Sequence, residues 1–404
     1  MTPAPENLEN TPEASRRVPA EVWVLVAAGF VIALGYGVVA PALPEFARSF
    51  DVGIAAASAV VSAFAIMRLA FAPATGPIVR RLGERYGYMI GVLVVALSTL
   101  AVAFAQNYWQ LIVFRGLGGV GSVLFSVSAM GLMIRIAPAE IRGRISGVYS
   151  SSFVLGSISG PLLGGALVGF GLRVPFVVYA VALVIAVAVV YLALRGSTLA
   201  RPAAAEPVAA MTVREAMRDS AYRAAFCTVL VFGWVYAMRV SLLPLFFTAQ
   251  LGQTAAMGGY ALAVYAAGDV VAMFPSGRGS DRFGRKPFLI VGLAVLGVGT
   301  LALALTSSVL VAFVVTFLSG LGTGMVSPAL QAVLADVLHG RGRSGTALSA
   351  YQMAQDAGTI TGPLVAGVIA QALGFSWAFT VTAVLAVLAA FAWIPARESR
   401  VTVP

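Results

Sequence analysis

Five ionisable residues stand inside long apolar stretches of this sequence: Arg68, Arg115, Arg239, Asp269 and Asp356. At the centre of a membrane helix each would cost about 2.5–3.5 kcal/mol on insertion scales, so each needs a partner, water or a function. A desolvated carboxyl group holds a proton more readily than an exposed one, so it can take up a proton on one side of a membrane and release it on the other. Asp356 is therefore the first candidate for proton coupling, and Asp269 is the second. A structural ion pair, for example between Asp269 and Arg239, is the alternative interpretation of both acids.

Polar and aromatic residues accompany these charges on the same stretches. Glutamine, serine and threonine side chains recur near them at the spacing of a helical turn, which is typical of a cavity wall. The aromatic side chains suit stacking on a flat or lipophilic ligand, with packing or a membrane-interface position as the alternative. The five charges sum to +1, which disfavours a dicationic ligand and leaves anionic, neutral and zwitterionic ligands open. The candidate lining residues of such a cavity are Tyr36, Arg68, Ser122, Ser126, Trp234, Tyr236, Arg239, Tyr265, Tyr351, Gln352, Gln355 and Thr359.

The composition indicates a membrane protein. Of 404 residues, 60% are hydrophobic and 10% are charged, whereas soluble domains carry about 25% charged residues. A single cysteine and a single histidine leave no disulfide framework, no metal site and no catalytic dyad. No phosphate-binding loop for ATP is present, so we expect no cofactor and a proton gradient as the source of energy.

The apolar segments predict twelve membrane helices, because a spanning segment needs about 20 apolar residues and must satisfy its own backbone hydrogen bonds. With both termini in the cytoplasm, 21 of the 26 basic residues lie inside, as the positive-inside rule expects. The net charge of +10 is therefore a topology signal, and no nucleic-acid partner is expected. The predicted fold class is an all-α membrane protein with spans at 22–46, 55–78, 88–106, 109–135, 144–170, 174–194, 222–248, 256–276, 287–306, 309–336, 344–373 and 376–395.

The two halves of the chain resemble each other at a shift of about 201 residues. Arg81-Leu82-Gly83 matches Arg282-Phe283-Gly284, and Gly119 and Gly121 match Gly320 and Gly322. Parallel repeats of this kind are one of the architectures of membrane transporters, with the substrate path between them. The expected divisions are a disordered tail at 1–20, six-helix bundles at 21–194 and 222–396, a cytoplasmic linker at 195–221 and a tail at 397–404.

Three motifs in the chain resemble those of the major facilitator superfamily, in particular its twelve-helix drug:proton antiporter branch. The stretch from Gly277 to Lys286 resembles the signature Gly-x-x-x-Asp-Arg-x-Gly-Arg-Lys, and Arg115 to Gly121 is similar to Arg-x-x-x-Gly-x-Gly. Gly156 to Gly165 fits the antiporter pattern Gly-x-x-x-Gly-Pro-x-x-Gly-Gly. The resemblance implies the following residues: Gly277, Asp281, Arg282, Gly284, Arg285 and Asp336 for a conformational latch, Gly156, Gly160, Pro161, Gly164 and Gly165 for the antiporter helix, and Arg115 for proton transfer.

The antiporter motif also has a physical interpretation that does not depend on the family. Gly156, Gly160 and Gly164 fall on one helix face, where glycine lets a second helix approach closely, and Pro161 can bend its helix. Plain helix packing is the alternative to an antiporter function. A structural role in hydrogen bonding is likewise the alternative for Arg115.

The first-half counterpart of the latch departs from the family pattern. Arg80 stands where the repeat has Asp281, and Arg135 stands where it has Asp336. We therefore predict an asymmetric latch built mainly in the second half, with Glu84 and Glu140 as first-half partners. Simple drift toward positive charge in the cytoplasmic loops is the alternative. The first-half latch residues are Gly76, Arg80, Arg81, Gly83 and Arg135.

The resemblance implies a monomeric secondary transporter in the bacterial cytoplasmic (inner) membrane that exports small lipophilic drugs or metabolites in exchange for protons. It would work by rocking its halves around a midplane site. A proton-independent facilitator, or a sugar or metabolite exporter of the same fold, is the alternative. A membrane enzyme or a receptor is disfavoured, because the sequence contains no nucleophile–base set and no soluble signalling domain.

Overall fold

The structure, a computed structural model, describes residues 20–136, 142–195, 211–338 and 346–399. Over these ranges it contains helices joined by short turns, which satisfies the backbone in lipid. A π-helical turn, Phe246–Gln250, continues α9. The α-helices are α1 Ala20–Val39, α2 Ala42–Arg48, α3 Ile54–Leu82, α4 Glu84–Ala103, α5 Tyr108–Ile136, α6 Arg142–Val168, α7 Val174–Leu194, α8 Val213–Ala216, α9 Ser220–Leu245, α10 Ala255–Phe283, α11 Arg285–Leu305, α12 Val309–Val337, α13 Thr346–Leu373 and α14 Phe375–Ala392.

The all-α membrane fold class predicted from the sequence is confirmed. Eleven helical segments of the described residues are long and apolar enough to cross a membrane. The remaining long helix, α13, has 28 residues but is more polar, because it carries the stripe of Gln352, Gln355, Asp356 and Thr359. The first predicted span is interrupted. The segment expected as a single helix at 22–46 is divided at Pro41 into α1 and α2.

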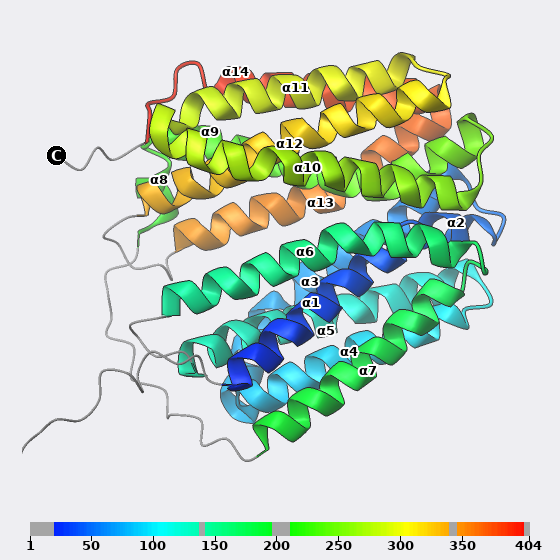
Figure 1. The fold of residues 1–404 in the computed structure, drawn as a ribbon, viewed down its shortest axis with the longest axis vertical. Coiled ribbons are helices and arrows are strands. Elements are labelled where there is room, and N and C mark those ends of the chain that lie inside the picture. The colour runs from blue at the N-terminus through cyan, green and yellow to red at the C-terminus, as the bar shows by residue number, and fades with distance from the viewer. Residues whose placement is uncertain (1–19, 137–141, 196–210, 339–345, 400–404) are drawn as a thin grey trace, which may run out of the picture.

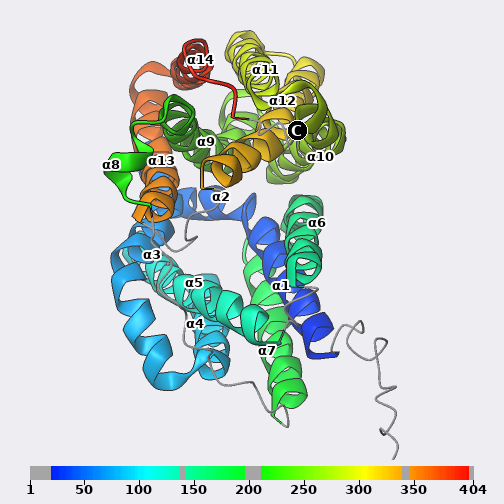
Figure 2. The same ribbon diagram turned by 90° about the vertical axis from the view of Figure 1, so that its left-hand side faces the viewer.

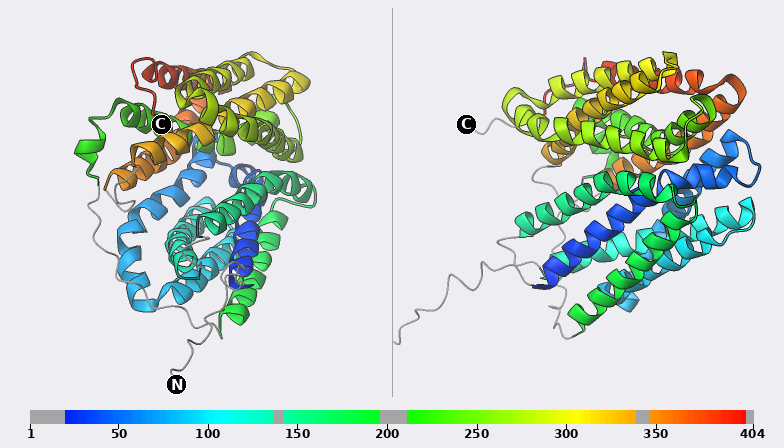
Figure 3. Two further views of the ribbon diagram at one scale, coloured as in Figure 1. Left: turned by 60° about the vertical axis from the view of Figure 1, so that its left-hand side comes forward. Right: turned by 45° about the vertical axis from the view of Figure 1, so that its right-hand side comes forward.

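Figure 1 shows two helical bundles one above the other, with α1–α7 in the lower bundle and α9–α14 in the upper. The chain enters α1 and leaves α14 on the same face, which we call the terminal face; the opposite face is the distal face. Figure 2 looks onto the terminal face, and Figure 3 shows the two bundles from two further directions. Within the lower bundle α1 packs on α6 and α7, and within the upper bundle α9 packs on α13 and α14.

The internal repeat predicted from the glycines is present in the packing. A Cβ on Gly119 of α5 would meet the carbonyl oxygen of Phe64, and one on Gly320 of α12 would meet that of Tyr265. Gly121 likewise faces Gly91, while Gly322 faces Gly292. Each pair of contacts is related by the same shift along the sequence. Glycine at these positions therefore allows the backbones of neighbouring helices to touch in both bundles.

The three glycines at four-residue spacing in α6 pack against α1, as their shared face predicts. A Cβ on Gly156 would lie 2.5 Å from the carbonyl oxygen of Phe30, and one on Gly164 would lie 2.9 Å from Pro41 Cγ. A Cβ on Gly160 would likewise lie 2.6 Å from Gly37 Cα. The close packing of α6 on α1 is thus confirmed.

The two bundles touch each other in the distal half of the molecule. The Ala55 amide donates to Gln371 Oε1 at 3.0 Å, and Ser62 Oγ donates to the Ile360 carbonyl oxygen at 2.7 Å. Thr248 donates a short hydrogen bond to Glu45. Gly165 of α6 also lies against α10: a Cβ added to Gly165 would be 3.1 Å from the Ala256 carbonyl oxygen. These contacts hold the distal ends of the bundles together.

On the terminal face, the chain end ties the upper bundle together. Arg397 Nε donates to Asp219 Oδ1 at 2.9 Å, and Asp219 also accepts a bond of 2.9 Å from the Ala221 amide at the start of α9. Partial burial disfavours the charged form of Asp219, but the bonds from Arg397 and Ala221 outweigh it and hold the pKa of this carboxyl below its ordinary value.

We expect Asp219→Asn to lower the melting temperature of the protein by a few °C at pH 7. A carboxyl with a lowered folded-state pKa stabilises the fold above its unfolded pKa, near pH 4, and the contribution is lost as the pH falls through the lower folded-state value. The difference in melting temperature between the two proteins should therefore shrink below about pH 4. Asp51→Asn, in an exposed turn, is the control. A difference that does not change with pH would contradict this assignment.

Candidate functional site

A cavity of about 480 Å³ lies between the two bundles; we call it the larger cavity because it exceeds the cavity that adjoins it in volume. Its wall comes from α1, α3, α4, α5, α6 and α7 on one side and from α9 and α13 on the other. Three charged side chains line it: Arg68, Arg115 and Asp356. Of the residues predicted to line a cavity or couple protons, it brings together Tyr36, Arg68, Arg115, Ser122, Ser126, Tyr236, Gln352, Gln355, Asp356 and Thr359.

A smaller cavity of about 150 Å³ adjoins the larger one, and Tyr36 and Tyr236 line both. It contains the remaining charged candidates, Arg239 and Asp269, together with Tyr265. The five intramembrane charges therefore gather at two neighbouring cavities, although the sequence spreads them over five helices.

Asp356 and Arg68 line the same cavity from different bundles. Asp356 is half-buried on α13, and Arg68 of α3 is the basic group whose charge acts on it. The ion pairs found among the described residues, all within 4.0 Å, do not include these two. They attract each other through the cavity without closing into a contact, so protonation of Asp356 would remove an attraction between the bundles.

Asp269 and Arg239 belong to the same bundle. Arg239 acts electrostatically on Asp269, and its guanidinium lies 4.0 Å from the ring centroid of Tyr265 and 5.2 Å from that of Tyr236. Asp269 Oδ1 is buried with no hydrogen-bond partner among the described residues. Tyr265 forms a short hydrogen bond with Thr323. The ion pairs found among the described residues do not include Asp269 and Arg239, so the structural ion pair between them stays an alternative interpretation.

Arg115 is the most deeply buried of the five charges, with 8% of its surface exposed. Its guanidinium lies 4.4 Å from the ring centroid of Phe64 and 5.7 Å from that of Tyr36. Its Nε is buried without a hydrogen-bond partner, and no described acid forms an ion pair with it. Ser122 and Ser126 continue along the same wall, as their spacing predicts.

Two predicted lining residues lie outside both cavities. Trp234 is buried inside the upper bundle, where its Nε1 donates to Thr382 Oγ1 at 3.0 Å, and Tyr351 is 2% exposed. Packing, the alternative weighed for the aromatic residues, describes these two. Phe64 and Ser157 also line the larger cavity, although they were not among the residues predicted to do so. Phe64 is one turn from Arg68 on α3, and this spacing is the signal that could have identified it.

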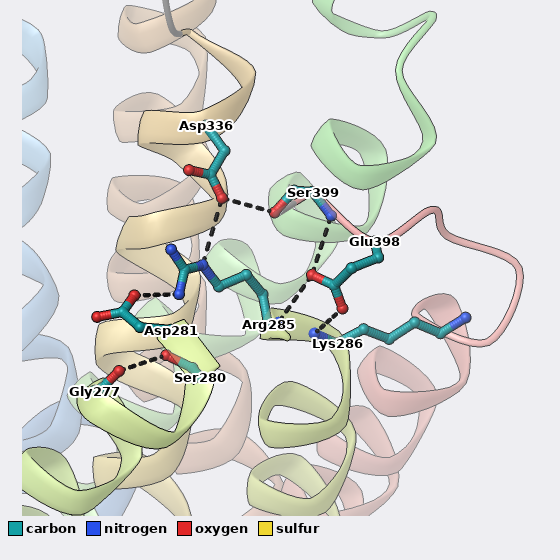
Figure 4. A network of polar contacts seen from close by, with 8 residues as sticks. All are labelled: Gly277, Ser280, Asp281, Arg285, Lys286, Asp336, Glu398 and Ser399. Carbon is teal, nitrogen blue, oxygen red and sulfur yellow. Dashed lines mark hydrogen bonds and ion pairs between the residues drawn. The ribbon is translucent and has the colours of Figure 1, made fainter. Parts of the chain in front are cut away.

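The second-half latch forms a polar network at the terminal face (Figure 4). Arg285 forms an ion pair with Asp281, and its Nε lies 3.4 Å from Asp336 Oδ2 at the end of α12. The sequence did not reveal the contribution of the chain end: Ser399 Oγ donates to Asp336 at 3.1 Å, and Glu398 accepts hydrogen bonds from the Arg285 and Lys286 amides at 2.8 and 3.1 Å. Glu398 thus caps the N-terminus of α11, where a carboxylate is favourable.

The stretch from Gly277 to Lys286 was expected as a loop, and this expectation was wrong. Residues up to Phe283 continue α10, α11 starts at Arg285, and the connection is the single residue Gly284. Gly284 has φ of +101°, and its counterpart Gly83 has φ of +79°, a region that favours glycine. Asp281 lies in the last turn of α10 and Arg285 begins α11, and the sharp turn at Gly284 between them allows their ion pair.

The first-half latch carries the opposite charges at the matching positions: Arg80, Glu84 and Arg135 stand where the repeat has Asp281, Arg285 and Asp336. The Glu84 side chain packs against Gly131 of α5, where a Cβ would lie 2.6 Å from Glu84 Cγ. The side chain of Arg135, and Glu140, fall outside the described residues, as does most of the 1–20 tail. The asymmetry of the latch in function stays a prediction.

Two six-helix bundles around a polar cavity define the class of membrane transporters built from parallel repeats. The chain belongs to the major facilitator superfamily, whose family model matches residues 25–257 and 225–404. The resemblance inferred from the motifs is confirmed. The chain is therefore a multi-pass membrane protein of a transporter family.

Multidrug transporters are among the similar proteins. The chain is 26% identical over 389 residues to the multidrug resistance protein MdtG of Salmonella paratyphi C, covering 93% of this chain and 95% of that protein. It is 25% identical over 322 residues to the bovine synaptic vesicular amine transporter, covering 78% of this chain. The chain spans 62% of the bovine protein's length and 42% of multidrug resistance protein 2 of Bacillus subtilis.

Solved structures share the fold. A bacterial homologue of the human lysosomal transporter Spinster, in an inward-facing and unoccupied conformation, superposes with a TM-score of 0.79 at 17% identity, covering 95% of this chain and 97% of that chain. A D-xylose-proton symporter gives a TM-score of 0.75 at 16% identity, covering 94% and 98%.

Proposed function

We propose that this transporter is a proton-coupled antiporter that exports small lipophilic drugs or metabolites. The observation that carries the proposal is the placement of Asp356 in the larger cavity, opposite Arg68 of the other bundle. A proton on Asp356 and a substrate in the cavity would compete for the same site, which is the physical basis of exchange. The similarity to multidrug resistance proteins supports a broad lipophilic substrate range.

Asp356 carries the proton in this proposal, with Asp269 as the second candidate and Arg115 as a participant in its transfer. Protonation of Asp356 weakens the attraction between α3 and α13, so proton binding and the relative position of the bundles are linked. The Gly277–Lys286 network on the terminal face then acts as the conformational latch, with its charged part built in the second half.

We further propose that the protein works as a monomer in the bacterial cytoplasmic membrane with its terminal face toward the cytoplasm. The basic residues gather on that side of the sequence-predicted topology. In this orientation the distal contacts close the outer side and the structure represents a cytoplasm-facing state. The two bundles move as the units 21–194 and 222–396, joined by the linker 195–221.

The proposal is tested by accumulation of aromatic probes in proteoliposomes under an imposed pH gradient. We expect uphill accumulation that collapses when the gradient is dissipated by an ionophore. The proton-independent facilitator, or sugar or metabolite exporter, is the alternative function. Transport that reaches the same level with and without the gradient would favour that alternative and contradict the antiporter.

A further inference from the structure

The charges that face the two cavities are unequally paired. Asp356 has Arg68 opposite it, and Asp269 has Arg239 beside it. Arg115 forms no ion pair with an acid among the described residues, and its Nε is buried there without a hydrogen-bond partner. The cavity system therefore contains one positive charge without a counter-charge on the protein.

Arg115 is held where an unpaired charge is costly. Only 8% of its surface is exposed, and a buried charge without a partner is strongly unfavourable. The Phe64 and Tyr36 rings offset part of this cost through cation–π contacts at 4.4 and 5.7 Å, but such contacts supply no hydrogen-bond acceptor for the guanidinium nitrogens. An anion that enters the cavity would supply both the charge and the acceptors.

The surroundings of Arg115 also specify the rest of the ligand. Ile32, Phe64, Phe125, Leu183 and Val95 line the same cavity, so an apolar or aromatic body is favoured next to the anionic group. A planar carboxylate matches the guanidinium, which binds two oxygens at once. Ser122 lies two helical turns from Arg115 on the same cavity wall and offers a neutral hydrogen-bond donor.

We propose that the larger cavity binds aromatic or lipophilic carboxylates, or zwitterions with such a carboxylate, and that Arg115 binds their carboxylate group. This inference rests on the proposed transport function only in taking the larger cavity as the substrate site. It separates this protein from transporters of cationic amines, because a cation placed beside Arg115 would meet an uncompensated positive charge.

The test compares three naphthalene derivatives of one ring system: 2-naphthoate, 2-naphthylmethanol and 2-naphthylmethylammonium. Their binding to the purified protein is measured by isothermal titration calorimetry at pH 7 in a buffer of low ionic strength that contains neither chloride nor a carboxylate, so that no buffer anion competes for the site. We expect naphthoate to bind at least about tenfold more tightly than the ammonium compound, the difference typical of a charged hydrogen bond. Equal binding, or tighter binding of the ammonium compound, would overturn the proposal.

Variants of Arg115 then test whether this residue binds the carboxylate. Arg115→Gln should weaken naphthoate binding by about tenfold or more and leave naphthylmethanol binding within about twofold, whereas Arg115→Lys should keep part of the preference for the anion. Arg48→Gln makes the same change at an exposed position and should have no effect. Unchanged naphthoate binding in Arg115→Gln would overturn the assignment.

Neither conclusion depends on proton coupling. Binding is measured without a membrane or a gradient, so a failure of antiport would leave the binding result intact. The comparison of the three probes on the unmodified protein also keeps the proposal testable if Arg115→Gln does not fold. Naphthoate preference without pH-gradient-driven transport would support the ligand class and reject antiport.

Discussion

Asp356→Asn should abolish uphill transport while leaving downhill exchange of the same substrate intact. Asparagine keeps the size and polarity of the side chain but cannot gain or lose a proton at neutral pH, so it fixes the cavity in the state with no charge opposite Arg68. We expect gradient-driven accumulation in proteoliposomes to fall by at least about tenfold, the effect of losing about 1.4 kcal/mol of coupling. Counterflow with substrate on both sides measures the uncoupled step.

Two further variants make the result specific. Asp51→Asn introduces the same chemical change in an exposed turn and should transport normally. Asp269→Asn tests the second candidate and should retain coupling, because Asp269 interacts with an arginine of its own bundle. Normal coupling in Asp356→Asn combined with its loss in Asp269→Asn would reverse the assignment.

Gly259→Ala should open the distal side of the molecule. Gly259 of α10 lies against Gly165 of α6 in the other bundle, and a Cβ on Gly259 would stand 2.8 Å from the Gly165 backbone nitrogen. The backbone cannot move aside as a flexible side chain can, and overpacking of this kind costs typically about 1–3 kcal/mol. Because the clash exists only while the distal ends touch, it destabilises that conformation relative to the open one.

The shift can be measured with a cysteine at the distal contact. Ser58 is fully buried where α3 meets Gly367 of α13, so Ser58→Cys, in a Cys227→Ser background, reacts with a membrane-impermeant maleimide only when the bundles separate. We expect Gly259→Ala to raise the labelling rate by about 5- to 150-fold, as 1–3 kcal/mol implies. An unchanged rate would contradict the role of this contact in distal closure.

Two glycines serve as controls for that experiment. Gly147→Ala in α6 adds a Cβ with nothing within 4 Å and should leave labelling and stability unchanged. Gly320→Ala adds a Cβ that clashes with the Tyr265 carbonyl oxygen inside the upper bundle. It should lower the melting temperature without increasing distal labelling, which separates damage to a bundle from a shift between conformations.

The sequence predicted the helices and the repeat well because both leave local signals. Spanning length and turn residues fixed most helix bounds to within a few residues, and Gly119, Gly121 and their partners Gly320 and Gly322 marked the backbone contacts of both bundles. Pro41 indicates the break between α1 and α2, and the prediction of a single first helix did not take it into account.

The sequence did not predict how each helix is rotated about its own axis. Trp234 and Tyr236 are two residues apart on α9, yet Trp234 packs inside its bundle and Tyr236 lines both cavities. These helices are apolar on all sides, so periodicity does not show which face meets lipid, cavity or protein. The part played by Glu398 was likewise hidden, because its contact with α11 joins segments 112 and 113 residues apart.

Substrate-induced proton release from proteoliposomes tests the central claim most directly. The protein is reconstituted without a pH gradient, a pH-sensitive dye is enclosed in the lumen, and a panel of anionic, neutral and cationic aromatic compounds is added outside. The account predicts a luminal pH change with every transported compound, and its absence in Asp356→Asn. Transport of any compound in the panel without proton movement in the unmodified protein would contradict proton-coupled antiport.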